Sequence, residues 1–117
     1  MNILILGGGG REHALAWKIS KSSFCNKLFI APGNAGTEKI GTNVDCNPND
    51  FEKIKKLSIK EEIEMIVVGP EDPLVNGIYD FFKNHSELEN ITIIGPSKEG
   101  ARLEGSKHFA KEFMERY

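Results

Sequence analysis

The chain has 117 residues and a net charge of −2 at pH 7 with neutral histidines, which is the size of one domain. It has no block rich in Lys and Arg, and no apolar run near the ~18 residues of a membrane helix, so the sequence predicts neither a nucleic-acid nor a membrane partner. The N-terminus lacks the basic segment of an export signal, so we expect a cytoplasmic protein. Cys25 and Cys46 are not in CxxC spacing and the histidines are scattered, so we expect free thiols and no metal site.

The first predicted strand, Ile3–Leu6, is followed directly by four glycines, Gly7–Gly10, and by a helix over Arg11–Ser20. Such a junction exposes backbone N–H groups at the positive end of a helix dipole, where phosphate often binds. Arg11 adds a guanidinium that can grip phosphate or carboxylate. A tight turn needs only one or two glycines, and each further glycine costs backbone entropy, so the run predicts an anion site. We expect positive φ angles at its last two glycines.

Strands and helices alternate along the rest of the chain. The nearly continuous apolar character of the strands is typical of strands covered on both faces. We therefore predict an α/β fold with an open parallel sheet and helices on both faces. The remaining predicted strands cover Leu28–Ala31, Ile40–Val44, Met65–Val68 and Ile91–Ile94.

Each predicted helix has an apolar face. In the first helix, Leu15 and Ile19 are four residues apart with Trp17 beside them. The second and third helices are predicted to begin with a cap followed by proline, at Asn47-Pro48 and Asp72-Pro73. Their apolar stripes consist of Phe51, Ile54 and Leu57, and of Leu74, Ile78, Phe81 and Phe82.

The loops that follow the strands are rich in Gly, Pro and Asn. In an open parallel sheet these loops share one edge, where ligands bind in a crevice. The polar residues that we expect on this edge are Arg11, Asn34, Thr37, Glu71 and Asp72. This mixture suits a ligand with a phosphate at one end and hydroxyl groups at the other.

The sequence disfavours two alternative functions. An NAD(P)-binding Rossmann domain of an oxidoreductase needs glycines at the first, third and sixth places of the turn. The sixth place is Glu12 counted from Gly7, or His13 counted from Gly8, so the fingerprint fails. A non-enzymatic nucleotide-sensing or phospho-receiver module would need an acidic cluster at the strand ends, which carry Gly, Pro and Asn instead.

Several motifs, in this order and spacing, resemble the N-terminal domain of the phosphoribosylamine–glycine ligase family, also called glycinamide ribonucleotide synthetases. The resemblance spans the whole chain, and its first two blocks are specific to the family. Gly8 stands where the family usually has Asn or Ser, and Asp72 where it often has Ala. The motifs are Gly7–Gly10 with Arg11–Trp17, Ala31–Thr37, Val68–Val75, and Gly95-Pro96 with Leu103–Lys107.

The resemblance implies a Rossmann-like, pre-ATP-grasp fold and an ATP-dependent ligase. The family joins glycine to 5-phosphoribosylamine through an enzyme-bound glycyl phosphate, forming ADP and phosphate, in de novo purine (IMP) biosynthesis. The resemblance also implies that ATP and Mg²⁺ or Mn²⁺ are held mostly by residues beyond Tyr117. We expect residues 1–105 to form the substrate-binding domain and residues 106–117 to begin a linker helix into an ATP-grasp domain.

The same resemblance implies which residues form the site, and the N–H groups expected at the start of the first helix support the phosphate contacts. The phosphate is expected on the N–H groups of Gly8, Gly9 and Gly10 and on Arg11. Glu71 is expected to accept hydrogen bonds from the ribose hydroxyls, or else to act only as a first-turn acid. Glu12 and His13 are interpreted as ordinary helix residues, and no catalytic residue is assigned. Further donors are expected from Asn34, Gly36 and Thr37, and Lys107 is expected either to reach the ATP phosphates or to be solvated.

The last predicted helix has a wide apolar stripe that runs to the end of the sequence. We expect this stripe to pack on an ATP-grasp domain, on a neighbouring molecule, or back on the sheet of this domain. It consists of Phe109, Ala110, Phe113, Met114 and Tyr117.

Overall fold

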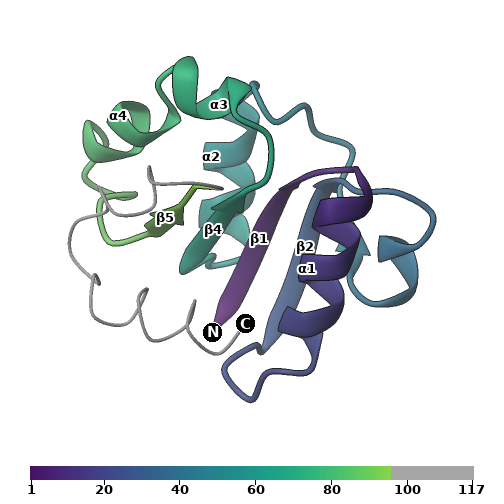
Figure 1. Ribbon diagram of the computed structural model, residues 1–117. Coiled ribbons are helices and arrows are strands. Elements are labelled where there is room, and N and C mark those ends of the chain that lie inside the picture. The colour runs from purple at the N-terminus through teal and green to yellow at the C-terminus, as the bar shows by residue number, and fades with distance from the viewer. Residues whose placement is uncertain (96–117) are drawn as a thin grey trace.

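The computed structural model describes residues 1–95, which form a five-stranded sheet flanked by helices (Figure 1). The elements are β1 (Asn2–Gly7), α1 (Gly10–Ser20), β2 (Lys27–Pro32), the 3₁₀ helix η1 (Thr37–Lys39), β3 (Thr42–Asn43), α2 (Phe51–Lys60), β4 (Met65–Val68), α3 (Asp72–Val75), α4 (Ile78–Lys83) and β5 (Thr92–Ile94). None of the helices described in this range is long and apolar enough to cross a bilayer.

The strands are all parallel, in the order β3-β2-β1-β4-β5. In Figure 1, α1 lies in front of the sheet and α2 lies behind it, so the predicted open parallel sheet with helices on both faces is confirmed. Successive strands run outward from β1 to β3, and the chain then returns to add β4 and β5 on the other side. The order therefore reverses between β1 and β4, and this switch point is where open α/β sheets bind ligands.

The core consists of the sheet and the inner faces of the helices. Every residue of β1 and of β4 is buried, as expected for parallel strands covered on both sides. In the register, Leu6 pairs with Ala31 of β2 and with Val68 of β4. The carboxyl ends of these three strands are therefore level, and the loops that follow them start at the same edge.

The inner face of α1 differs in part from the prediction. Ile19 is buried as expected, but the side chain of Trp17 is 51% exposed and the face is completed by Ala16 and Glu12. The Lys21 ammonium lies 4.8 Å from the centre of the Trp17 ring. The prediction for Trp17 was wrong because residues 12, 16 and 19 lie on one helical face and residue 17 points away from it.

Helix α2 begins three residues later than predicted. Its N-cap is Asp50, whose carboxylate accepts a hydrogen bond of 3.2 Å from the N–H of Lys53. Asn47 is not the cap: its side chain accepts from the N–H of Asn49 at 2.8 Å and closes a local turn. Asn and Asp both form such turns and caps, so the sequence motif could not separate them.

We expect Asp50→Ala to lower the free energy of unfolding by about 1 kcal/mol, since it removes the N-cap acceptor. Asp50→Asn keeps an acceptor of the same shape and is expected to stay close to the parent protein. Thermal unfolding of both variants measures the difference. Equal losses in the two variants would show that the cap hydrogen bond does not stabilise α2.

The third predicted helix is broken into α3 and α4. Gly77 lies between them with a φ of +91°, a conformation that interrupts a right-handed helix. Ile78 and Phe82 are nevertheless buried as predicted. The N-cap of α3 is Glu71 and not Asp72, which is already the first helical residue.

The predicted strands Ile3–Leu6, Leu28–Ala31 and Met65–Val68 are confirmed, and the strand predicted over Ile40–Val44 is reduced to Thr42–Asn43. The predicted helix over 106–117, Lys107 and the domain boundary at residue 105 lie outside the described residues.

Candidate functional site

Three loops meet at the carboxyl edge of the sheet. The loop after β2 is joined to β1 by a hydrogen bond of 3.1 Å from the N–H of Gly33 to the carbonyl of Gly7. The loop after β4 is also joined to β1, by a hydrogen bond of 2.9 Å from the N–H of Gly69 to the carbonyl of Leu6. A Cβ at Gly8 would lie 2.7 Å from the Gly33 carbonyl oxygen, so this close approach of two backbone segments suits glycine.

The backbone of the glycine run differs from the prediction. Positive φ occurs at Gly7 (+131°) and not at Gly9, which is extended, or at Gly10, which opens α1. The reason is that the chain turns as it leaves β1, before the helix begins. Gly8, Gly9 and Gly10 are all exposed, so the run forms an open surface at the N-terminus of α1.

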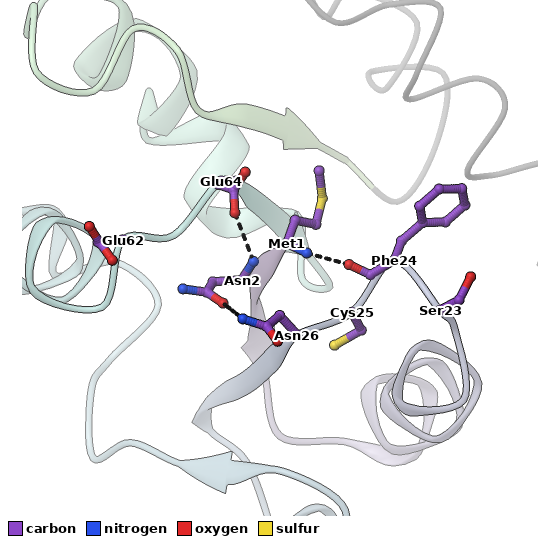
Figure 2. A pocket seen from close by; sticks show the side chains of 8 residues that line it. All are labelled: Met1, Asn2, Ser23, Phe24, Cys25, Asn26, Glu62 and Glu64. Carbon is purple, nitrogen blue, oxygen red and sulfur yellow. Dashed lines mark hydrogen bonds between the residues drawn. The ribbon is translucent and has the colours of Figure 1, made fainter.

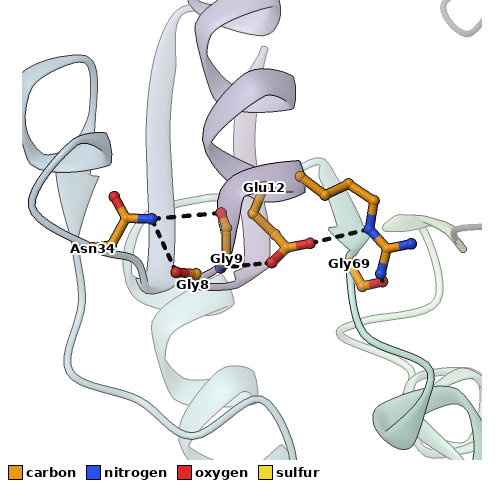
Figure 3. Close-up of polar contacts among 6 residues, drawn as sticks. Gly8, Gly9, Glu12, Asn34 and Gly69 are labelled. Atoms are coloured by element: carbon orange, nitrogen blue, oxygen red, sulfur yellow. Dashed lines mark hydrogen bonds and ion pairs between the residues drawn. The ribbon is translucent and has the colours of Figure 1, made fainter.

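The N–H groups of the run are not equivalent. The N–H of Gly9 donates to Oε1 of Glu12 at 2.8 Å (Figure 3). Within residues 1–95, the N–H groups of Gly8 and Gly10 make no hydrogen bond to the protein. Gly8 and Gly10 thus present exposed donors at the positive end of α1, where an anion is stabilised.

The sequence does not predict the buried position of Glu12. Its side chain is only 9% exposed, although it lies in the first turn of a surface helix. The available signal was the spacing of a glutamate three residues after the N-cap, which is that of a capping box.

Arg11 links two of the loops. Its Nη2 donates to the carbonyl of Gly69 at 2.9 Å, and its Nε lies 3.4 Å from Oε2 of Glu12. The Arg11 side chain is 68% exposed, and among residues 1–95 its other N–H groups have no hydrogen-bond partner, so they can meet an anion.

Asn34 organises the loop after β2 and holds it against the glycine run. Its Nδ2 donates to the carbonyl of Gly8 at 2.9 Å and reaches that of Gly9 at 3.5 Å (Figure 3). Its Oδ1 accepts from the N–H groups of Gly36 and Thr37 at 2.8 and 2.9 Å. The donors expected from Gly36 and Thr37 are therefore engaged with Asn34 in this structure.

Thr37 is fully buried inside this loop. Its Oγ1 accepts from the N–H of Asn34 at 2.8 Å and lies 2.7 Å from Oδ1 of Asn43. Asn43 also donates to the carbonyl of Asn34 at 2.8 Å. The sequence does not predict a role for Asn43, because the partners of its side chain are six and nine residues away.

Glu71 and His13 occupy the rim of the same edge. Glu71 is exposed, follows Gly69 by two residues, and makes no side-chain hydrogen bond to cap α3. The ring of His13 lies against Gly36, where a Cβ would come within 2.4 Å of its Cε1. The structure thus brings the site residues that were predicted between positions 8 and 71 to one edge of the sheet.

A hollow of about 530 Å³ lies at the opposite end of the strands (Figure 2). It is lined by Met1, Asn2, Ser23, Phe24, Cys25, Asn26, Glu62 and Glu64. The N-terminal ammonium donates to the carbonyl of Phe24, and the N–H of Asn2 donates to Glu64 at 3.1 Å. Burial raises the pKa of the Cys25 thiol, an effect that the nearby ammonium opposes. Because the N-terminal ammonium and the Asn2 N–H are already hydrogen-bonded within the protein, we interpret the hollow as part of the amino end of the sheet and not as a ligand site.

Among residues 1–95, no three or more His, Cys, Asp or Glu side chains gather as a set of metal ligands.

Comparisons with known proteins agree on one family. The family model described as the N domain of phosphoribosylglycinamide synthetase matches residues 1–104. The chain is 48% identical to a phosphoribosylamine–glycine ligase of Fusobacterium nucleatum, over all of this chain and 26% of that protein. It is 39% identical to a bifunctional purine biosynthetic protein of Pichia angusta, over all of this chain and 15% of that protein. A crystal structure of the phosphoribosylamine–glycine ligase of Thermotoga maritima is 36% identical with a TM-score of 0.50, over all of this chain and 25% of that one.

The chain thus spans about a quarter of the length of the curated bacterial relatives that it matches. The alternative of an oxidoreductase cofactor domain is not supported, since these relatives are ligases. The structure gives a physical reason as well. The sixth place of the turn is Glu12, and its carboxylate occupies the space between Gly7 and Gly69.

Proposed function

Since the chain belongs to the family of phosphoribosylglycinamide synthetase N domains, we propose that it is the substrate-binding domain of a phosphoribosylamine–glycine ligase. The longer protein would join glycine to 5-phosphoribosylamine with hydrolysis of ATP to ADP and phosphate, in purine biosynthesis. The observation that carries this proposal is the meeting of exposed glycine N–H groups and Arg11 at the switch point between β1 and β4.

The 5′-phosphate would be held by the N–H groups of Gly8 and Gly10 together with the Arg11 guanidinium. The helix dipole of α1 and the exposed N–H groups favour an anion at this point. Gly9 would contribute through its place in the turn, since its N–H is engaged by Glu12. Arg11 would add charge-assisted hydrogen bonds, which are stronger than neutral ones.

The loop after β2 would shape this phosphate site. Asn34 binds the carbonyls of Gly8 and Gly9, whose peptide planes carry the N–H groups of Gly9 and Gly10, and so holds the Gly10 N–H that would meet the phosphate. Gly36 and Thr37 in turn hold the side chain of Asn34. We propose that these three residues support the site from within the loop.

Glu71 would accept hydrogen bonds from the ribose hydroxyls. It lies on the rim, just past the Gly69 carbonyl that holds Arg11, and its side chain is exposed. A carboxylate accepts two hydroxyl groups well, since it has two oxygens and no donor when ionised.

ATP and Mg²⁺ or Mn²⁺ would be bound mostly by the rest of the longer protein, with Lys107 as a contact to the ATP phosphates. The metal would neutralise charge that develops on the phosphates. The part of residues 1–95 in the reaction is to bind and orient the phosphoribosylamine, which lowers the entropy cost of bringing its amine to the activated glycine. A cytoplasmic location fits this role.

The proposal is tested by assaying ADP formation with glycine, 5-phosphoribosylamine and ATP. We expect the protein of the relatives' full length to form ADP only when all three are present, and the 117-residue chain alone to form none. A full-length protein without this activity would refute the ligase proposal. Activity of the purified chain alone would refute its role as a binding domain that depends on the remainder.

A further inference from the structure

Glu12 holds a buried carboxylate at the switch point. It lies between the last residue of β1 and the first residue after β4: a Cβ at Gly7 would come within 2.5 Å of its Cγ, and a Cβ at Gly69 within 2.4 Å of its Oε2. Both neighbours are glycines, so the side chain fills the space that they leave. A buried carboxylate costs solvation free energy unless it is paired and hydrogen-bonded.

The two oxygens of this carboxylate have different partners. Oε1 accepts the N–H of Gly9 at 2.8 Å, and Oε2 lies 3.4 Å from Nε of Arg11. Arg11 continues the chain of contacts to the carbonyl of Gly69 at 2.9 Å. Glu12 therefore connects the glycine run to the loop after β4, through an arginine whose side chain is otherwise 68% exposed.

We propose that Glu12 is a positioning residue for the substrate phosphate. It acts through Arg11, which it holds at one orientation over the switch point, and through Gly9, whose N–H it fixes in the turn. An exposed arginine without such contacts would have to be ordered when the ligand binds, at a cost in affinity. This inference rests on the proposed function, because the ligand that Arg11 meets is the phosphate of the phosphoribosylamine.

The variant that separates this role from packing is Glu12→Gln in the full-length enzyme. Glutamine has nearly the same shape and can still accept the N–H of Gly9. Its amide nitrogen would then face Nε of Arg11 as a second donor, so the contact to Arg11 is lost. Glu38→Gln, which changes an exposed acid on η1, is the matched control.

We expect Glu12→Gln to raise the KM for phosphoribosylamine about tenfold, with kcat and the KM values for ATP and glycine unchanged. In an Arg11→Ala background, the same substitution should change this KM less than twofold, because the residue through which it acts is already missing. A merely structural role would lower the thermal midpoint without this dependence on Arg11.

An unchanged or lowered KM in Glu12→Gln, with a raised KM in Arg11→Ala, would overturn the role of Glu12 and leave the phosphate site standing. Full additivity of the two substitutions would also overturn it. An unchanged KM in Arg11→Ala would instead refute the proposed phosphate site, and the role of Glu12 with it.

Discussion

Replacing Gly7 by alanine is expected to destabilise the domain and to weaken phosphoribosylamine binding together. The φ of +131° at this position is strained for any residue with a Cβ, and the new Cβ would overlap the Glu12 side chain at 2.5 Å. Strain in such a backbone region costs about 1–3 kcal/mol. The overlap would also displace Glu12 from the N–H of Gly9 at the start of α1, and loss of this capping hydrogen bond costs about 1 kcal/mol more. The thermal midpoint of the chain should fall on the order of 10 °C, and the KM for phosphoribosylamine in the full-length enzyme should rise.

Gly10→Ala is the matched control for this variant. Its Cβ would meet no atom of the described part of the chain within 4 Å, and its backbone is already helical. Alanine restricts the unfolded chain more than glycine does, so this variant should be as stable as the parent or slightly more stable. If the two variants lost equal stability, the conformation of the glycine run described above would be wrong.

Glu71→Ala is expected to raise the KM for phosphoribosylamine about ten- to a hundredfold. This follows from the loss of hydrogen bonds between a charged acceptor and the ribose hydroxyls, worth roughly 1.5–3 kcal/mol. Glu71→Gln keeps one acceptor oxygen and should fall between the parent and the alanine variant. Steady-state kinetics of the full-length enzyme, with ATP and glycine saturating, measures the effect.

Asp72→Ala controls for the alternative role of Glu71 as an acid at the start of α3. Both carboxylates are exposed near this helix terminus, so each stabilises it by about 0.3–1 kcal/mol. Only Glu71 is proposed to reach the ribose, and only its loss should change the KM. A lowered thermal midpoint with an unchanged KM in Glu71→Ala would show that this residue only stabilises the start of α3 and does not bind the ribose.

The sequence predicted the sheet well because hydrophobic runs, and the glycines that follow them, are local signals. Ile3–Leu6 and Met65–Val68 are apolar throughout and lie in strands buried on both faces. Helix starts were less predictable where several capping residues compete. Asn47 and Asp50 both accept backbone N–H groups in the structure, and only tertiary packing decides which of them begins α2.

The candidate site could be predicted in outline and not in its contacts. The glycine run, Arg11 and Asn34 were singled out from the sequence, and the structure places them together. The bond from Arg11 to Gly69 joins residues 58 positions apart, and no spacing rule predicts it. The sequence predicts an ordinary first-turn acid at Glu12, and it does not predict the burial of this side chain, which depends on two glycines, one at the end of β1 and one after β4.

The most direct test is a crystal structure of the full-length protein with glycinamide ribonucleotide, the product of the proposed reaction. We expect its phosphate to lie against the N–H groups of Gly8 and Gly10 and the guanidinium of Arg11, with the ribose hydroxyls on Glu71. A phosphate bound away from the loop between β1 and α1 would contradict the proposed site.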